Sequence, residues 1–126
     1  MKLLHTMLRV TDLARSIDFY TSVLNMKLVR TLENGQFRYT LAYLAYSDND
    51  HAAELELTWN WDEDSYDMGS AYGHIAIGVT DIYQFCNKLK RLGCEVSREP
   101  GPVAGGDIVI AFIRDPDGYP IELIQV

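Results

Sequence analysis

The sequence predicts an α+β fold built of two βαβββ modules in tandem. The first observation is an internal repeat, because residues 4–13 recur as residues 73–82, with His5 aligned on His74 at a shift of 69 positions. The second is that both halves show the same order of alternating strand patterns, one helical pattern and turn residues. Such a repeat indicates a duplicated unit, so both halves should fold alike.

The repeat extends to the last expected strand of each half. Residues 54–57 align with residues 120–123 at a shift of 66 positions, which places Glu56 on Glu122. The shift is smaller here than at the start of the repeat, which indicates short deletions in the loops. Each half therefore carries one His on its first expected strand and one Glu on its last.

In the first half, residues 3–10 alternate as a strand does, with His5 and Arg9 on the same face. The Thr-Asp pair at residues 11–12 can cap the helix that follows, and Asn25 stands where a left-handed C-cap is expected. Apolar side chains recur in this helix at helical spacing, which predicts its core face. They are Leu13, Ile17, Tyr20 and Leu24.

Three strands complete the first module. They are expected at residues 26–32, 36–46 and 52–59, the first two joined by a hairpin turn at residues 33–35. The third strand alternates, so apolar and polar side chains lie on opposite faces. Its apolar face carries Leu55, Leu57 and Trp59, and its polar face carries Glu54, Glu56, Thr58 and Asn60. Glu54 shares the face of Glu56 and is either a residue that supports metal ligands without binding metal or, as we favour, an edge charge.

The second half repeats this plan. Its helix begins at Ile82, Gly93 is the expected C-cap, and residues 115–118 read Asp-Pro-Asp-Gly, which is typical of a tight turn. We therefore expect one domain, residues 1–126, made of modules at about 1–60 and 73–126 joined by an acidic linker at 61–72. The strands of the second module are expected at residues 73–80, 95–98, 107–113 and 119–126.

Composition excludes several classes of function. A net charge of −7 argues against binding nucleic acid, whose phosphates require a basic surface. No apolar stretch approaches the ~20 residues of a membrane helix, and no signal peptide is recognised, so we expect no membrane partner and a cytoplasmic location. Cys86 and Cys94 lack the spacing of a redox or zinc motif and are expected to be buried, reduced thiols.

The duplicated His and Glu predict a metal site. If the modules are related by a pseudo-twofold axis, His5, Glu56, His74 and Glu122 converge, and two imidazoles with two carboxylates suit a divalent first-row ion. Taken singly, a strand His is more often a hydrogen-bonded structural residue, and a strand Glu usually lies on a solvated face. The recurrence of both residue types at matching positions favours the metal site.

At these residues the chain resembles the glyoxalase I family of the vicinal-oxygen-chelate superfamily. The resemblance covers essentially the whole chain and is carried by residues 4–10, 54–61, 71–76 and 115–123, which are specific to that family only as a set. It implies mixed sheets that form half-barrels, and a homodimer with its sites at the subunit interface.

The resemblance also implies an activity and a set of site residues. The activity is isomerisation of the hemithioacetal of methylglyoxal and glutathione to S-lactoylglutathione through a cis-enediolate. Carried over by motif, the four residues of the predicted metal site are the ligands, Glu122 is the general base, and Glu56 is its mirror partner. Arg9, Asn60 and Thr58 would then bind glutathione, in agreement with the strand faces described above.

The resemblance to the short bacterial branch, with His at the first ligand position, implies Ni²⁺, with Co²⁺ possible and Zn²⁺ as the alternative. Two positions depart from the family. Ala104, in a loop that resembles a clamp on the glycine end of glutathione, stands where many relatives carry Lys, and Ser70 stands where some carry Arg.

Other functions on the same scaffold are alternatives. An epimerase that works through an enolate would not require Arg9 and Asn60, and an extradiol dioxygenase needs two His and one carboxylate on iron, so a fourth ligand counts against it. A non-catalytic binding protein of this fold would lack a complete ligand set.

Overall fold

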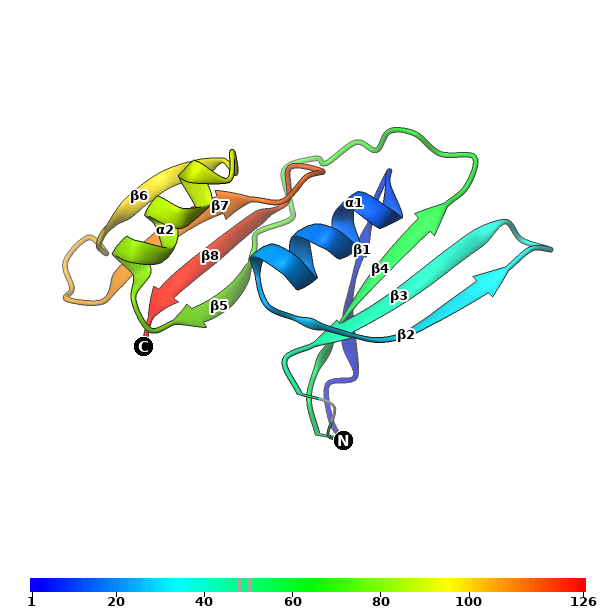
Figure 1. Cartoon of the computed structure of the whole chain (residues 1–126), viewed down its shortest axis with the longest axis horizontal. Helices are drawn as coiled ribbons and strands as arrows, with labels where there is room; N and C mark the ends of the chain where they lie inside the picture. The colour runs from blue at the N-terminus through cyan, green and yellow to red at the C-terminus, as the bar shows by residue number, and fades with distance from the viewer. Residues whose placement is uncertain (48, 50) are drawn as a thin grey trace. The chain divides into compact units, whose positions relative to one another are not determined.

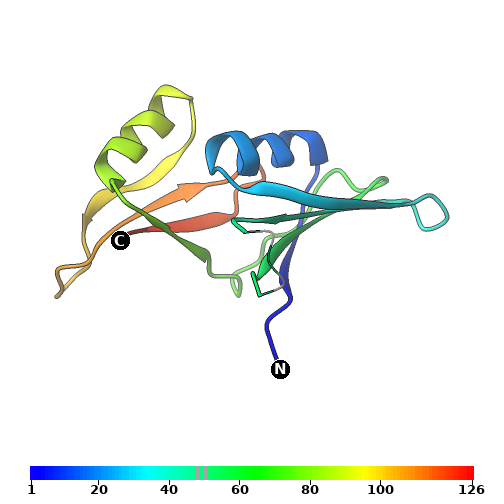
Figure 2. The same ribbon diagram turned by 60° about the horizontal axis from the view of Figure 1, so that its bottom comes forward.

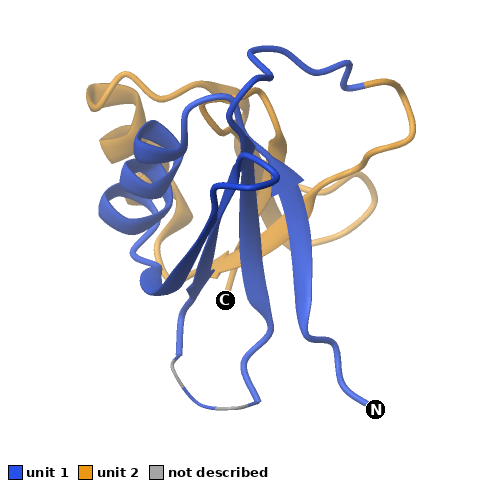
Figure 3. Cartoon of the chain, turned by 90° about the vertical axis from the view of Figure 1, so that its right-hand side faces the viewer, with its two compact units in different colours: residues 1–68 blue, residues 69–126 orange. Residues whose placement is uncertain are grey.

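The computed structural model describes residues 1–47, 49 and 51–126, which form two compact units. Unit 1 comprises Met1–Met68 and unit 2 comprises Gly69–Val126. Figure 3 shows the two units in different colours. Each unit consists of one four-stranded mixed sheet with a helix, which confirms the predicted α+β fold with two βαβββ modules.

Unit 1 has the strand order β1-β4-β3-β2, with β1 parallel to β4 and the other pairs antiparallel. The helical segment between β1 and β2 begins as an α-helix and ends in a π-helical turn, η1. The elements, shown in Figure 1, are β1 (His5–Arg9), α1 (Leu13–Asp18), η1 (Phe19–Val23), β2 (Lys27–Asn34), β3 (Tyr39–Ala45) and β4 (Glu54–Asn60).

Unit 2 repeats the topology with the strand order β5-β8-β7-β6. Its first strand is parallel to its last, and the other neighbours are antiparallel, as in unit 1. The elements are β5 (Ile75–Val79), α2 (Ile82–Arg91), β6 (Val96–Pro102), β7 (Val109–Arg114) and β8 (Pro120–Gln125). The second strand of the second half was predicted at residues 95–98, and β6 in fact extends four residues further.

In each unit the helix covers one face of its own sheet, as Figure 2 shows, and the core lies between them. Leu55 and Leu57 of β4 are buried on this face, as are Ile121 and Leu123 of β8. Because successive side chains of a strand point to opposite faces, Glu56 and Glu122 lie on the sheet face away from the helix. The strand faces predicted from alternation are thus confirmed.

Both helical segments begin and end with the same kinds of capping residue. The carboxylates of Asp12 and Asp81 accept hydrogen bonds from the backbone N–H groups of Arg15 and Gln84, each at 3.0 Å. At the other end, Asn25 and Gly93 adopt the left-handed conformation, with φ of 60° and 78°. Both C-caps were predicted from the residue type, since Asn and Gly are the residues that tolerate this backbone.

Replacing Gly93 with Ala should destabilise unit 2 by about 1 kcal/mol, because a Cβ is strained at positive φ although the space around it is open. Urea unfolding followed by circular dichroism measures this change. Gly35→Ala is the control, since Gly35 is not at positive φ and also has open space around it. Equal midpoints for the two variants would contradict the assignment of Gly93 as a conformationally required cap.

The predicted hairpin turn at residues 33–35 is wrong in position. β2 continues to Asn34, the turn occupies residues 35–38, and Arg38 rather than Gly35 adopts a positive φ of 57°. The Arg38 guanidinium forms a bidentate pair with Asp62 at 2.8 Å and lies 5.3 Å from the Trp61 ring centroid. In addition, the backbone N–H of Trp61 donates a hydrogen bond to the backbone carbonyl of Arg38. These long-range contacts place the left-handed residue at the end of the turn.

Both cysteines are free thiols in the structure, as predicted. Cys86 is fully buried in the core of unit 2, whereas Cys94 is only partly buried, and burial raises the pKa of both thiols. Across the described residues, none of the helices is both long and apolar enough to span a bilayer.

Candidate metal centre

The first predicted ligand pair forms on two neighbouring strands of unit 1. β1 runs parallel to β4, and His5 lies opposite Glu54 in the register, so Glu56 is two residues further along on the same face. The His5 Nε2 atom lies 3.1 Å from Glu56 Oε2. The side chain of His5 is 39% exposed and that of Glu56 only 11%, so the carboxylate is held within the sheet while the imidazole reaches solvent.

The second predicted pair repeats this geometry in unit 2. His74 directly precedes β5, and Glu122 lies on the parallel strand β8, opposite Ala76. The His74 Nε2 atom lies 3.2 Å from Glu122 Oε2, and the two side chains are 40% and 18% exposed. Each unit therefore presents one exposed imidazole nitrogen beside one largely buried carboxylate.

These distances fit a shared metal ion. Two atoms bound at about 2.1 Å to one ion, at adjacent corners of an octahedron, are about 3 Å apart. The N···O separations of 3.1 and 3.2 Å match this spacing. Within each unit the described residues bring together one such pair, and no group of three or more His, Cys, Asp or Glu side chains. Each unit thus supplies two donors, which is half of the predicted set.

An aromatic residue on the next strand packs against each His. The Tyr43 ring lies 5.8 Å from that of His5, and the Phe112 ring lies 5.2 Å from that of His74, both edge to face. In the sheet registers Tyr43 is opposite Glu56 and Phe112 is opposite Glu122. Only tyrosine has a hydroxyl, which donates a 2.9 Å hydrogen bond to Glu56 Oε1. Partial burial, followed by this hydrogen bond, raises the pKa of Tyr43.

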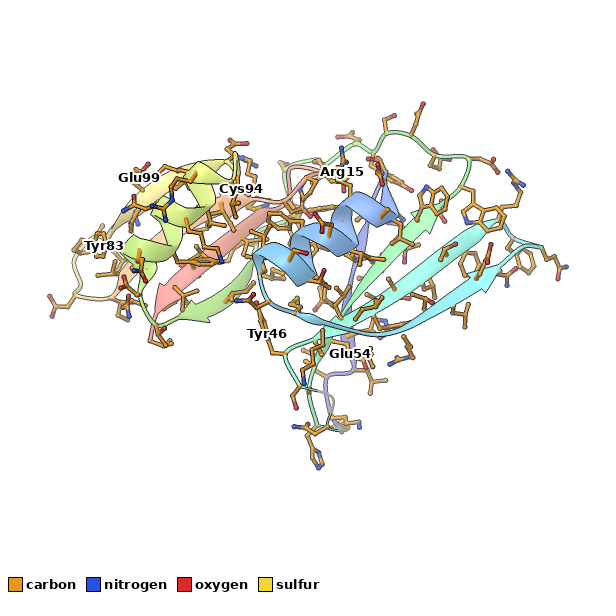
Figure 4. All side chains as sticks on the ribbon, in the orientation of Figure 1. Arg15, Tyr46, Glu54, Tyr83, Cys94 and Glu99 are labelled. Carbon is orange, nitrogen blue, oxygen red and sulfur yellow. The ribbon has the colours of Figure 1, made fainter. Side chains whose placement is uncertain are left out.

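Of the two sequence-based interpretations of Glu54, the favoured one, an edge charge, is wrong, and the contacts of Glu54 fit the alternative, a residue that supports the ligands. The Glu54 carboxylate accepts two hydrogen bonds from the Arg30 guanidinium, at 2.7 and 2.8 Å, and Arg30 also lies 3.9 Å from the centroid of the Tyr43 ring. The hydrogen bonds from Arg30 lower the pKa of Glu54, and the same pair raises the pKa of Arg30. Figure 4 labels Glu54 on the ribbon of unit 1.

A cavity of about 450 Å³ opens beside this cluster within unit 1. His5, Tyr43, Arg30 and Glu54 all contribute to its wall, together with the N-terminal residues that precede β1. The His5 side of the candidate metal centre is therefore open to small molecules rather than covered by its own unit.

Sequence comparisons agree with this architecture. A profile of the Glyoxalase/Bleomycin resistance protein/Dioxygenase superfamily matches residues 2–123. The chain is 60% identical over 125 residues to the lactoylglutathione lyase of Haemophilus influenzae, an alignment that covers 99% of this chain and 93% of that protein. The chain belongs to the lactoylglutathione lyase, or glyoxalase I, family.

Two further members of the family extend the comparison. The lactoylglutathione lyase of Escherichia coli O157:H7 is 57% identical over 125 residues, with 99% of this chain and 93% of that protein aligned. The crystal structure of glyoxalase I from Zea mays superposes with a TM-score of 0.94 at 44% identity and covers 99% of this chain. This chain spans only 44% of the maize chain. Membership of the glyoxalase I family implies a divalent metal ion.

The residues that the family resemblance assigns to glutathione lie along β1 and β4 in unit 1. Arg9 is opposite Thr58 in the parallel register, and Asn60 follows two residues further along β4. The Asn60 side-chain amide donates a hydrogen bond of 3.0 Å to the Tyr66 hydroxyl. Arg9 and Thr58 are thus neighbours in the sheet, and they share the polar face of the two strands with His5 and Glu56.

The two departures from the family lie at exposed positions of unit 2. Ser70 precedes β5 in the connecting segment, and Ala104 lies in the turn between β6 and β7. That turn is closed by backbone hydrogen bonds from Val103 N to Ile108 O and from Gly106 N to Val103 O. The loop is therefore closed by its own backbone, and Ala104 contributes no cationic side chain to it, while Asp107 contributes a negative one.

Sequence reasoning missed the pairing of Tyr43 with Glu56. A signal for it was present, because the shift of 69 positions that aligns His5 with His74 also aligns Tyr43 with Phe112. Both residues are aromatic, and each is opposite the Glu of its module. Following the repeat through the third strand would have found Tyr43 and Phe112 as equivalent positions with a single hydroxyl between them, but not that each lies opposite its Glu.

Proposed function

We propose that this chain isomerises the hemithioacetal of methylglyoxal and glutathione to S-lactoylglutathione, the reaction of a lactoylglutathione lyase. The observation that carries the proposal is the repetition of one His–Glu pair in both units, at 3.1 and 3.2 Å, in a chain 60% identical to a lactoylglutathione lyase. The substrate forms spontaneously when methylglyoxal and glutathione are mixed, and its product is a thioester.

We propose His5, Glu56, His74 and Glu122 as the ligands of one divalent ion, most favourably Ni²⁺, with Co²⁺ or Zn²⁺ as alternatives. Two nitrogen and two oxygen donors are a set that several first-row ions accept, so the donor types support a divalent ion without selecting nickel. When bound, the ion stabilises the negative charge that develops on two adjacent substrate oxygens. Nickel is the ion that the resemblance to the short bacterial branch favours.

The residues of the chain have to move one carbon-bound proton. The reaction removes it from the carbon that bears sulfur and returns it to the adjacent carbonyl carbon. The proton of the hydroxyl on the first carbon passes to the oxygen of the second, so the first carbon becomes the thioester carbonyl, the second bears the hydroxyl, and no atom is gained or lost overall. We propose that the Glu122 carboxylate takes and returns this proton, because a carboxylate beside both carbons can serve as base and then as acid.

Glutathione binding is proposed for Arg9, Thr58 and Asn60, where a guanidinium and an amide can hold a carboxylate and an amino group of the peptide. Arg9→Ala is expected to raise KM for the hemithioacetal by about tenfold while kcat changes little, because the contact is far from the reacting carbons and holds substrate and transition state alike. Steady-state assays over a range of hemithioacetal concentrations measure both constants. Arg91→Ala, at the exposed end of α2, is the control. An unchanged KM for Arg9→Ala would contradict the proposed contact between Arg9 and glutathione.

A homodimer with its metal sites at the subunit interface is part of the proposal. Each unit presents only two of the four donors on a sheet face away from its helix, and a complete set needs two such faces. We propose that the modules act as one domain within each subunit, and that residues 61–72 join them. Sedimentation velocity distinguishes monomer from dimer. Reduced Cys86 and Cys94 agree with a cytoplasmic location, which stays a prediction.

The proposed function is tested directly by adding the purified, metal-loaded protein to methylglyoxal and glutathione. The thioester absorbance should rise at a rate proportional to protein concentration, and NMR of the product should identify S-lactoylglutathione. A protein that binds a divalent ion but produces no thioester would contradict the lyase assignment and favour a binding protein of the same fold.

A further inference from the structure

The two halves of the candidate metal centre are alike in their ligand pairs but differ in what surrounds each carboxylate. The His–Glu distances agree to within 0.1 Å, at 3.1 and 3.2 Å, and an aromatic ring stacks edge to face on each His. The ring is a tyrosine in unit 1 and a phenylalanine in unit 2. Of the two rings, therefore, only that of unit 1 carries a hydroxyl.

The Tyr43 hydroxyl donates a hydrogen bond to the oxygen of Glu56 that does not contact His5. Oε2 lies 3.1 Å from His5, and Oε1 accepts the 2.9 Å hydrogen bond from Tyr43, so both oxygens have partners. Glu122 has only the first of these contacts, at 3.2 Å from His74. Phe112 stands opposite Glu122 as Tyr43 stands opposite Glu56, and it has no hydroxyl that could make the matching hydrogen bond. The carboxylate of Glu56 therefore has a contact on each oxygen, whereas unit 2 provides the corresponding contact to only one oxygen of Glu122.

Tyr43 is itself held in place. Arg30, which is opposite Tyr43 in the β2–β3 register, lies over its ring at 3.9 Å, and the guanidinium is anchored by two hydrogen bonds to Glu54. A cation over an aromatic face is attracted by the ring, and the bidentate carboxylate fixes the plane of the guanidinium. The chain Glu54–Arg30–Tyr43–Glu56 thus positions one ligand through three neighbours on β2, β3 and β4.

Unit 2 lacks each part of this chain. Arg98 is opposite Phe112 as Arg30 is opposite Tyr43, but its guanidinium donates to the backbone carbonyls of Ile110 and Pro102 at 2.6 and 3.0 Å. The residue two positions before the Glu, which is Glu54 in unit 1, is Pro120 in unit 2. The difference between the halves therefore includes the supporting residues as well as the hydroxyl.

We propose that Tyr43 is a positioning residue that keeps Glu56 as a fixed metal ligand and so leaves Glu122 as the carboxylate that can move to exchange a proton with the substrate. The inference rests on the proposed function, and it explains from this structure why two carboxylates at repeated positions have different roles. Tyr43 acts through Glu56 and does not itself touch the reacting carbons.

The first test measures metal binding and needs no turnover. Tyr43→Phe removes the hydroxyl and keeps the ring that packs on His5, so the affinity for Ni²⁺, measured by competition with a chromophoric chelator, should fall about tenfold, as is usual when a group that orients a ligand is lost. The d–d spectrum of the Co²⁺-loaded variant should shift, because one ligand is no longer fixed. An affinity and a spectrum equal to wild type would overturn the proposal.

Tyr46→Phe is the matched control. Its hydroxyl also donates a 2.9 Å hydrogen bond, but to the backbone carbonyl of Leu24, away from the ligands. Figure 4 labels Tyr46 in unit 1. This variant should bind nickel as wild type does, and a loss as large as that of Tyr43→Phe would show that any lost tyrosine hydroxyl loosens unit 1, which would overturn the specific role of Tyr43.

The second test asks whether the released carboxylate can take over as base. The double variant Tyr43→Phe/Glu122→Gln, saturated with nickel, should turn over about tenfold faster than Glu122→Gln alone, because Glu56 is free to rotate. Phe112→Tyr, which places a hydroxyl opposite Glu122, should lower kcat about tenfold while nickel affinity is kept. The proposal would be contradicted if the double variant turned over at the same rate as Glu122→Gln alone and Phe112→Tyr kept the wild-type kcat.

The two tests separate this inference from the proposed function. If wild type binds nickel but yields no thioester, the proposed reaction fails while the affinity comparison still decides whether Tyr43 positions Glu56. If wild type is active but Tyr43→Phe and Tyr46→Phe are alike in metal affinity and spectrum, the reaction stands and the role of Tyr43 is refuted.

Discussion

Replacing Glu122 with Gln is expected to lower kcat by about 10²–10⁴-fold, which is the usual contribution of a general base. The amide keeps the shape of the carboxylate and an oxygen that can bind metal, but it cannot accept the proton taken from carbon. Because Gln matches Glu in shape, the substitution should leave the rest of unit 2 unchanged although Glu122 is only 18% exposed. The rate of thioester formation at saturating hemithioacetal and metal measures the effect.

Glu99→Gln is the control for this substitution. Glu99, which Figure 4 labels, is exposed on β6 and pairs with Lys90 at 3.1 Å, and β7 separates β6 from the strand that carries Glu122. This variant should keep the wild-type kcat. That result would mean that the loss of one carboxylate from unit 2 does not by itself reduce turnover. A near-normal kcat for metal-loaded Glu122→Gln would contradict the role of Glu122 as the general base.

Removing the metal is expected to abolish activity altogether. In the proposed reaction a divalent cation stabilises the charge on adjacent substrate oxygens, so protein dialysed against a strong chelator should fall below about 1% of its loaded rate. Equimolar Ni²⁺ should restore the most activity, Co²⁺ a part of it and Zn²⁺ the least. The rates are measured after each ion is added back to the same stripped sample.

The order of activity must be measured apart from the order of affinity. First-row ions follow a general affinity series in most nitrogen and oxygen sites, so tight binding of Zn²⁺ alone says little about which ion supports turnover. Each ion should therefore be shown to bind in stoichiometric amount before rates are compared. Strong activation by Zn²⁺ alone would refute the assignment of nickel as the activating ion. Full activity of protein that has been verified to contain no metal would refute the metal site itself.

The fold was predictable because the repeat supplied the same information twice. The alternation in β4 and β8 identified the faces of Glu56 and Glu122, and burial of Leu57 and Leu123 confirms it. Strand alternation has a period of two, so one buried residue determines the face of its neighbours. The pairing of each Glu with its His then follows from the parallel register of the first and last strands of each module.

The rest of the site depends on contacts between residues distant in sequence. The hydrogen bond of Tyr43 requires that β3 be aligned with β4 so that Tyr43 is opposite Glu56, and the ion pair of Arg30 with Glu54 crosses the sheet from β2 to β4. Alternation within one strand carries no information on either register. The turn after β2 was misplaced for the same reason, since Asp62 and Trp61 bind Arg38 from beyond the next two strands.

The hydroxyl of Tyr43 also limits how the duplicated halves can evolve. Gene conversion between them, which would copy the sequence of one half onto the other, would leave a chain with either two tyrosines or two phenylalanines at positions 43 and 112. The first product would have both carboxylates anchored, and the second would have neither anchored. If the two carboxylates have the roles proposed for them, selection for one carboxylate of each kind would act against homogenisation and would preserve the divergence of the ancestral copies.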